Sequence, residues 1–182
     1  MFKKFTREEV HSKSNIKSSV QRGLRSRLVE QFPKLEDVID EIIPKKSQLV
    51  QIKCANKISL YAVGNEVLFI QHFDDDLVPS LRLVHKYPET FPSVRVDRGA
   101  IKFILGGANI MCPGLTSKGA TLPDAPGYDK GSIVAIYAEG KEHALAVGEL
   151  VMSTEEIKSV NKGIGVNLIN YLGDGLWVNK DL

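Results

Sequence analysis

The chain has 182 residues and a net charge of +2, with 43% hydrophobic and 25% charged residues. This composition is typical of a globular protein with one sizeable domain or two small ones, and it excludes wholesale disorder. No apolar run is long enough to cross a bilayer and no apolar leader follows residues 1–5, so we expect a cytoplasmic protein without membrane contact.

Two amphipathic helices are predicted near the start of the chain. Apolar residues at four-residue steps predict a helix that ends before Pro33. These residues are Ile16, Val20, Leu24 and Leu28. A second apolar set predicts another helix over residues 35–43, closed by Pro44. Residues 1–27 also carry eight Lys and Arg against two Glu, which fits either a polyanion-binding surface or a solvated helix face.

Three strand-like segments follow, at residues 49–54, 58–63 and 66–73. Gly64 and Asn65 separate the last two segments and tolerate positive φ, so these strands predict a tight hairpin. The hairpin is a candidate free edge to which a partner could add a strand, unless helices of its own domain cover it.

The acidic run at residues 74–76 predicts an exposed loop rather than a metal site, because no further oxygen ligands can be located in the sequence. Pro79 then suits the first position of a short helix over residues 80–86.

Pro88 and Pro92 bracket an extended connection, where we place the boundary between domains of residues 1–92 and 93–182. The second domain is expected to be rich in short strands. Its apolar runs lie at residues 94–96, 101–105, 133–138, 144–151 and 166–172. The Gly- and Pro-rich passage 106–131 predicts long turns, and the whole pattern favours a small, nearly closed barrel.

Ser153 and Glu156 have the spacing of a capping box and predict a short helix that Gly163 ends in the left-handed conformation. Trp177, near the end of this barrel, would either stack on a base or fill the core, and the core position is favoured.

No catalytic or metal-binding constellation is recognisable, so we predict no catalytic residues, no metal and no cofactor. The four His stand apart from one another in the sequence, and Gly114–Gly119 lacks the lysine of a phosphate-binding loop. Cys54 and Cys112 are too few for a disulfide framework and are predicted to be buried thiols of a reducing compartment.

The run from Asp97 to Leu115 carries Asp-x-Gly-Ala, then Gly-x-Asn and Pro-Gly. This pattern resembles the opening of a PUA domain, the pseudo-barrel RNA-binding module appended to pseudouridine synthases and archaeosine transglycosylases. Residues 138–148 are similar to the second half of that module. The resemblance extends over the whole chain to the malignant T-cell amplified sequence family, called translation machinery-associated protein in yeasts. The further matching segments are residues 1–5, 43–46, 81–88 and 160–165.

The resemblance implies an α+β protein, with an N-terminal α/β domain of two helices and a small antiparallel sheet followed by a C-terminal PUA-type β pseudo-barrel. It implies a non-enzymatic factor that pairs with density-regulated protein and binds the small ribosomal subunit and its rRNA. The heterodimer would remove deacylated tRNA after termination and support recycling and reinitiation, and direct contact with tRNA is left open. The alternative is an RNA-modification enzyme, or its accessory subunit, that holds structured RNA through the PUA domain.

In PUA domains RNA lies against the glycine-rich turn and its helix, which implies a set of RNA-binding residues here. They are Arg98, Lys102, Gly106, Gly107, Asn109, Pro113 and Gly114. Asn109 could instead be a turn residue, and Gly106–Gly107 a β-bulge. Four basic residues of the N-terminal domain would extend this surface, or would simply be solvated. They are Lys45, Lys46, Arg82 and Lys86.

Overall fold

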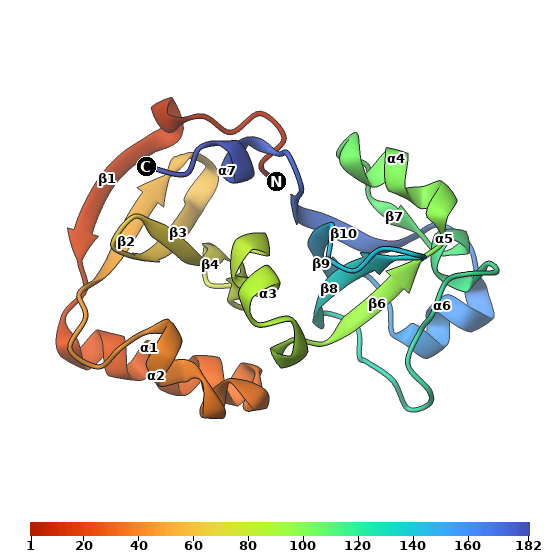
Figure 1. Cartoon of the computed structure of the whole chain (residues 1–182), viewed down its shortest axis with the longest axis horizontal. Coiled ribbons are helices and arrows are strands. Elements are labelled where there is room, and N and C mark those ends of the chain that lie inside the picture. The colour runs from red at the N-terminus through yellow and green to blue at the C-terminus, as the bar shows by residue number, and fades with distance from the viewer.

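The structure is a computed structural model that describes residues 1–182 as two lobes side by side (Figure 1). The N-terminal lobe contains an antiparallel sheet in the order β1-β2-β3-β4-β5. Its strands are β1 (Val10–Asn15), β2 (Leu49–Cys54), β3 (Ile58–Val63), β4 (Glu66–His72) and β5 (Val78–Pro79). Its helices are α1 (Ser18–Gln31), α2 (Ile39–Ile42) and α3 (Leu81–Lys86). No helix of the chain combines the length and apolar character that crossing a membrane requires.

The C-terminal lobe is a curled second sheet in the order β6-β8-β9-β10-β7. Its strands are β6 (Ser93–Val96), β7 (Ile110–Met111), β8 (Ile133–Ala138), β9 (Ala146–Leu150) and β10 (Ile164–Tyr171). The β6–β8 pair is parallel and the other pairs are antiparallel. Short helices border this sheet, and the last one turns back toward the N-terminal lobe (Figure 1). They are α4 (Ile101–Leu105), α5 (Pro113–Thr116), α6 (Thr154–Val160) and α7 (Gly175–Val178). The predicted α+β class is confirmed, with strands close to the expected positions.

The first helix begins later than predicted, because a strand precedes it. Ile16 donates its amide to Leu49 O at 2.9 Å and so belongs to the edge of the sheet rather than to α1. Val20 is 56% exposed whereas Leu28 is fully buried. A four-residue step advances about 40° around a helix with 3.6 residues per turn, so the predicted stripe drifts away from the core.

The second predicted helix is interrupted. A 3-10 segment (Pro33–Asp37) and the single turn of α2 are separated by Val38, whose ψ of 0° is not helical. The apolar face itself is confirmed, because Leu35, Ile39 and Ile43 are all buried.

The hairpin of β3 and β4 is not a free edge, so that prediction is wrong. Strand β2 pairs with one side of the hairpin and β5 with the other, which leaves β1 and β5 as the outer strands. Strand β1 has mostly exposed side chains and lies at the outer rim of the lobe (Figure 1).

Three local predictions also need correction. Residues 101–105 form a helix, not a strand. Pro79 ends β5, and Ser80 caps α3 by accepting the Leu83 amide at 3.2 Å. Asn161, with φ of 48°, is the left-handed C-cap of α6, two residues before Gly163.

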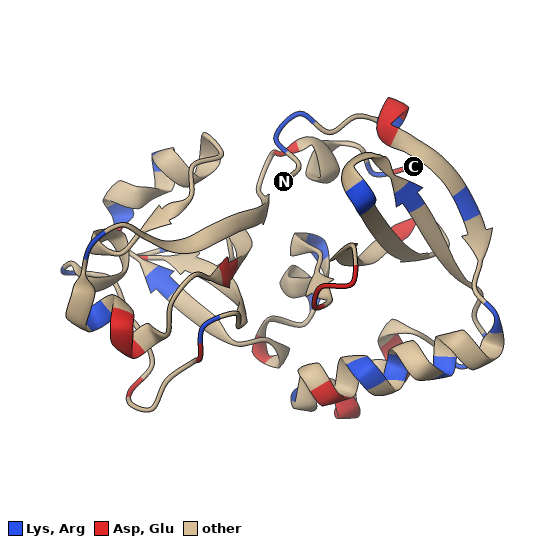
Figure 2. Cartoon of the chain, turned by 180° about the vertical axis from the view of Figure 1, so that it is seen from behind, with Lys and Arg blue, Asp and Glu red and all other residues tan.

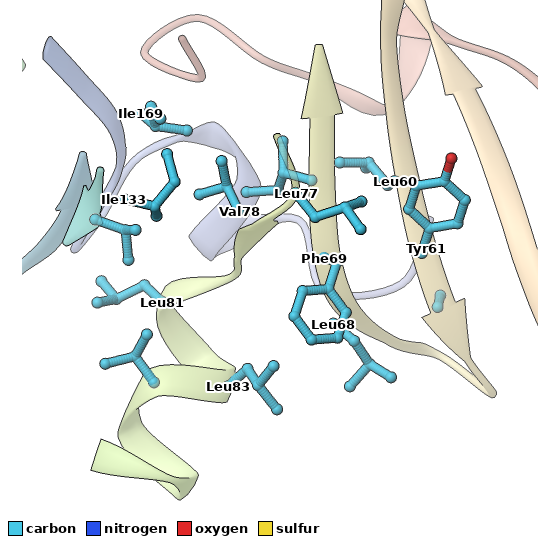
Figure 3. Close-up of a cluster of buried hydrophobic side chains, with 14 of the residues drawn as sticks. Leu60, Tyr61, Leu68, Phe69, Leu77, Val78, Leu81, Leu83, Ile133 and Ile169 are labelled. Carbon is cyan, nitrogen blue, oxygen red and sulfur yellow. The ribbon is translucent and has the colours of Figure 1, made fainter. Parts of the chain in front are cut away.

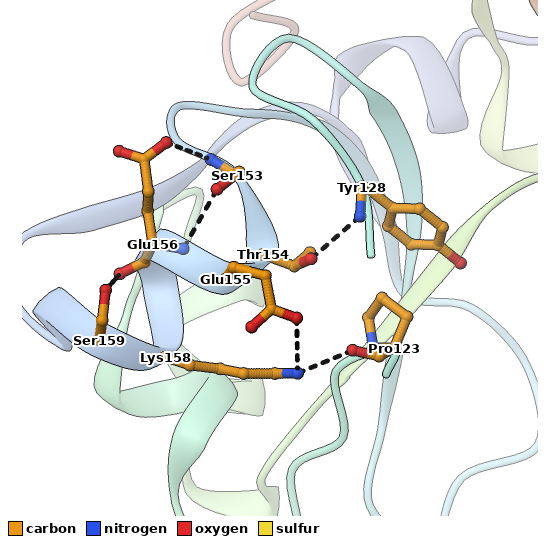
Figure 4. Close-up of polar contacts among 8 residues, drawn as sticks. All are labelled: Pro123, Tyr128, Ser153, Thr154, Glu155, Glu156, Lys158 and Ser159. Atoms are coloured by element: carbon orange, nitrogen blue, oxygen red, sulfur yellow. Dashed lines mark hydrogen bonds and ion pairs between the residues drawn. The ribbon is translucent and has the colours of Figure 1, made fainter. Parts of the chain in front are cut away.

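The capping box at Ser153 and Glu156 is confirmed and anchors the long turn-rich passage (Figure 4). Thr154 accepts the amide of Tyr128 at 3.0 Å, and Lys158 donates to the carbonyl oxygen of Pro123 at 2.9 Å. The passage therefore packs on α6, although it has no regular strand or helix of its own between α5 and β8.

One hydrophobic cluster joins the two lobes. Val78 and Leu81 of the N-terminal lobe meet Ile133 and Ile169 of the second sheet, and all four are buried (Figure 3). His85 adds a polar contact between the lobes through its Nε2, 2.7 Å from the carbonyl oxygen of Ala144. Because burying apolar surface is the main favourable term in folding, the lobes are expected to unfold together.

The C-terminal segment is tied to the N-terminal lobe by a network of hydrogen bonds. Asp174 caps α7 and accepts the Tyr171 amide, the Trp177 amide and Asn170 Nδ2, each at 2.8 Å. Burial raises the pKa of this carboxyl, and the three hydrogen bonds oppose that shift. Asn170 in turn accepts the Leu81 amide at 2.7 Å, so the network reaches α3 in the other lobe.

Both cysteines are buried free thiols, as predicted. Burial raises the pKa of the Cys54 thiol to about 11, and the nearby Glu9 carboxylate adds to the shift. At pH 8 only about one such thiol in a thousand is ionised. We expect iodoacetamide to label Cys54 roughly 100-fold more slowly in the native protein than in urea, as followed by peptide mass spectrometry. Equal labelling rates in the native protein and in urea would contradict the burial of the Cys54 thiol.

Candidate RNA and partner interfaces

The predicted cationic residues of the C-terminal lobe lie on residues 97–105, which we call the α4 segment: Arg98 precedes α4 and Lys102 lies within it. Asp97 opens this segment by accepting the Ala100 amide at 3.0 Å. Arg98 and Lys102 are both exposed, and the Lys102 ammonium lies 5.1 Å from the centre of the Phe103 ring. The Arg98 amide donates to the Glu139 carboxylate at 3.1 Å, which fixes the backbone from which both cations project.

The predicted glycine turn lies at the end of α4. Gly107 has φ of +88°, and an added Cβ would come within 3.1 Å of both the Lys3 side chain and the Tyr171 hydroxyl. Glycine is therefore required both by the backbone and by this close approach. Lys3 was not predicted to lie here, because nothing in the sequence links the chain start to residue 107.

Asn109 has a structural role. Its Oδ1 accepts the amide of Leu168 at 2.9 Å, which holds the turn against β10. A contact from Asn109 to RNA stays a prediction, and it would have to use the remaining hydrogen-bonding capacity of the amide group.

The other predicted PUA residues border a depression that we call the apolar groove. It has a volume of about 590 Å³ and passes between α4, β7 and the start of β10. Asn109, Pro113 and Gly114 line it together with three apolar side chains: Phe103, Met111 and Ile164. Phe103 is 60% exposed, Met111 50% and Ile164 38%. A cluster of exposed large apolar side chains is a protein-interaction feature more than a phosphate-binding one.

Sequence reasoning missed the apolar groove. Apolar residues in short runs were expected to be buried in a barrel, and α4 was expected to be a strand. In the structure residues 101–105 form a short helix at the edge of the lobe, in which Ile104 is buried while Phe103 and Leu105 are exposed.

The basic residues of the N-terminal lobe fall into two separate places. Lys45 and Lys46 are exposed beside α1, where Gln21 Nε2 donates to the Ser47 carbonyl oxygen at 3.3 Å. Lys and Arg also occupy several positions along α1 (Figure 2), although Arg25 is paired with Asp40. Arg82 and Lys86 lie instead on α3, facing the C-terminal segment.

The structure thus divides the predicted RNA-binding residues among the α4 segment, the apolar groove, the surface beside α1 and helix α3. It brings no group of three or more His, Cys, Asp or Glu side chains into an arrangement that could hold a metal ion.

The architecture is that of a pre-PUA domain followed by a PUA domain, which defines the class of the protein. The pre-PUA-like domain model matches residues 4–88, and the PUA domain model matches residues 92–172. A crystal structure of a hypothetical protein from Pyrococcus horikoshii has the same fold, with a TM-score of 0.74 at 23% identity. The similarity covers 91% of this chain and 98% of that one.

Similarity to curated proteins extends over nearly the full length. The chain is 70% identical to translation machinery-associated protein 20 of Saccharomyces cerevisiae, over 97% of each chain. It is 50% identical to malignant T-cell-amplified sequence 2 of Homo sapiens, over 99% of this chain and 98% of the relative. The chain belongs to the family of translation machinery-associated protein 20 and the malignant T-cell-amplified sequence proteins.

Proposed function

We propose that this protein is a non-catalytic translation factor that binds the small ribosomal subunit as a heterodimer with density-regulated protein. In this role it promotes release of deacylated tRNA after termination and supports reinitiation, in the cytoplasm. The observation that carries the proposal is the full-length similarity to relatives named for association with the translation machinery, across both domains.

The apolar groove is the surface we assign to the protein partner. Phe103 and Met111 expose large apolar surface that water solvates poorly, and a partner side chain would bury it. Asn109 and Ser117 in the lining, and Lys102 beside the Phe103 ring, add polar groups around this apolar surface, as in a docking site with an apolar centre and a polar rim. This surface replaces the hairpin of β3 and β4 as the candidate.

The cations on the α4 segment are assigned to rRNA. Arg98 and Lys102 have exposed charged groups and make no ion pair with a protein carboxylate. Unpaired cations can displace the counterions of a phosphate backbone, which makes binding sensitive to salt. The exposed Lys45 and Lys46 beside α1 would extend the contact on the N-terminal lobe.

Binding to purified small ribosomal subunits, with and without density-regulated protein and at two or more salt concentrations, tests this function. We expect saturable, salt-dependent binding that the partner strengthens. The double charge reversal Arg98→Glu/Lys102→Glu should reduce the slope of log affinity against log salt by about two. The matched control Lys53→Glu/Lys57→Glu reverses two exposed cations, on β2 and in the turn between β2 and β3, and should leave the slope unchanged.

Lys102 borders the apolar groove, so partner binding by the reversed variant is measured first, by size-exclusion chromatography. An unchanged slope in a variant that still binds the partner would contradict the assignment of Arg98 and Lys102 to rRNA. Binding no tighter than to generic duplex RNA, with or without the partner, would contradict the proposed function itself.

A further inference from the structure

Arg82 is set apart by an unused hydrogen-bond donor. Its Nε is the single buried side-chain nitrogen or oxygen of the chain without a hydrogen-bond partner. The rest of the guanidinium is well anchored, because Nη2 donates to the Trp177 carbonyl oxygen at 2.7 Å and the group lies 3.8 Å from the centre of the Trp177 ring. A buried donor without an acceptor is unfavourable. The buried Nε is closed to a ligand, but Nη1 makes no hydrogen bond within the chain and is not among the buried atoms, so it is the donor that an acceptor from outside the chain can reach.

The donor lies at a cleft between the turn of β3 and β4, α3 and the C-terminal segment. The cleft has a volume of about 620 Å³, within the range of sites for small ligands. Its lining includes Arg82, His85, Lys86, Trp177, Asn179 and Lys180. None of these residues lines the apolar groove or belongs to the α4 segment.

Aromatic rings gather at this cleft. His85 meets Trp177 edge-on with ring centres 5.3 Å apart, and His143 follows at 5.6 Å from His85. The Nε2 contact to the Ala144 carbonyl oxygen holds the His85 ring in place, whereas His143 is exposed. Of these three rings, those of His85 and Trp177 line the cleft, and aromatic rings in a cleft provide flat faces on which a nucleobase can stack.

The charge of the cleft is modestly positive. Lys86 is paired with Glu66, so the pair contributes little net charge. Arg82 and Lys180 remain as cations, with Asp181 as the one other carboxylate in the lining. This balance suits one or two phosphate groups rather than the dense phosphates of a duplex, and a fixed arginine favours a phosphate oxygen as the acceptor.

We propose that this cleft binds a nucleotide of single-stranded RNA, with a phosphate against Arg82 and Lys180 and the base against the ring of Trp177. The site is a second RNA contact, between the N-terminal lobe and the C-terminal segment and apart from the PUA glycine turn. It requires neither the ribosome nor the protein partner, so it can be tested on the free chain.

The single tryptophan of the chain reports directly on this cleft. Titration with hexa-adenylate ribonucleotide should change Trp177 fluorescence saturably, and affinity should fall with salt with a log–log slope of about −0.7 to −1.4. Inorganic phosphate and a glutamate-rich peptide are titrated in parallel. Phosphate is expected to compete weakly with the oligonucleotide, and the peptide is expected to have no effect.

Variants are compared by fluorescence anisotropy of labelled hexa-adenylate, because Arg82→Gln alters the surroundings of the tryptophan itself. We expect Arg82→Gln to weaken binding at least tenfold and Lys180→Gln about threefold. Lys53→Gln, which removes an exposed cation elsewhere, should have no effect. His143→Ala is a second control, because His143 is exposed and does not line the cleft, and it should leave binding unchanged.

Several outcomes would overturn the proposal. These are no saturable response to hexa-adenylate, a response to the acidic peptide in its place, or equal losses in Arg82→Gln and Lys53→Gln. If Arg82→Gln does not fold, unchanged binding in Lys180→Gln would overturn it equally. Small-subunit binding that depends on Arg98 and Lys102 is a separate measurement, so failure here leaves the proposed function standing.

Discussion

Replacing Gly175 with alanine is expected to lower the midpoint of thermal unfolding by roughly 5–10 °C, which corresponds to about 2–3 kcal/mol for a chain of this size. Gly175 begins α7, and its amide donates to the Phe2 carbonyl oxygen at 2.8 Å. An added Cβ would lie 2.8 Å from the same oxygen and even closer to the carbonyl oxygen of Phe5. Both neighbours are backbone atoms, so the methyl group forces α7 and the chain start apart.

The loss extends beyond one contact because α7 and the chain start hold each other. Phe2 and Phe5 are buried with their rings edge-to-face at 5.3 Å, and Asn179 Nδ2 donates to the Phe5 carbonyl oxygen at 3.4 Å. When α7 moves, the hydrogen bond from Asn170 to the buried Asp174 carboxylate weakens. The hydrogen bond from the Leu81 amide at the start of α3 to Asn170 weakens with it. We therefore expect one cooperative transition at lower temperature, recorded by calorimetry, rather than separate melting of one lobe.

Gly23→Ala is the matched control, because it makes the same change at a helical position where an added Cβ meets nothing within 4 Å. Alanine is the better helix former, so this variant should be more stable by about 0.5–1 kcal/mol. The same substitution thus has opposite effects at two glycines. A Gly175→Ala protein that melts within a degree of the parent would refute the close packing of α7.

The sheets could be predicted well because strands carry their signal locally. The segments 49–54, 58–63 and 133–138 are apolar runs bounded by turn residues, and all three are strands in the structure. Strand β1 was missed for the same reason, since Val10 is its one apolar residue and its side chains are largely exposed. It is a strand because β2 offers it hydrogen bonds, which is a property of the fold and not of its own residues.

The candidate sites could be predicted only in part. The resemblance located the α4 segment and its glycine turn, but the exposure of Phe103 depends on how the short helix α4 packs on the rest of the lobe. Trp177 was expected either to stack on a base or to fill the core, and in the structure it is partly buried against the cluster that joins the lobes and packs on Arg82 of the N-terminal lobe. The histidines were expected to stand alone, but His85 and His143 meet across the lobes. Contacts between residues so far apart in sequence arise only from tertiary packing.

Replacing Phe103 with aspartate is expected to weaken binding of density-regulated protein by roughly 30-fold or more while the fold is retained. The ring is 60% exposed, so its removal takes little from the core. In a docked complex the same ring would be desolvated at the centre of the apolar groove, and truncation of such an aromatic residue typically costs about 2 kcal/mol or more. Aspartate adds the desolvation of a charge, which increases the loss. Isothermal titration with the purified partner measures the change, and circular dichroism confirms the fold.

Phe73→Asp is the control that separates the two candidate surfaces. Phe73 is 61% exposed, almost the same as Phe103, and it follows β4 at the end of the hairpin first considered as a partner edge. Its φ of 51° is better tolerated by aspartate than by phenylalanine, so the fold should not suffer. If the apolar groove binds the partner, Phe103→Asp loses affinity and Phe73→Asp keeps it. The reverse result would move the interface to the N-terminal sheet, and equal affinity in both variants would show that neither aromatic side chain anchors the partner.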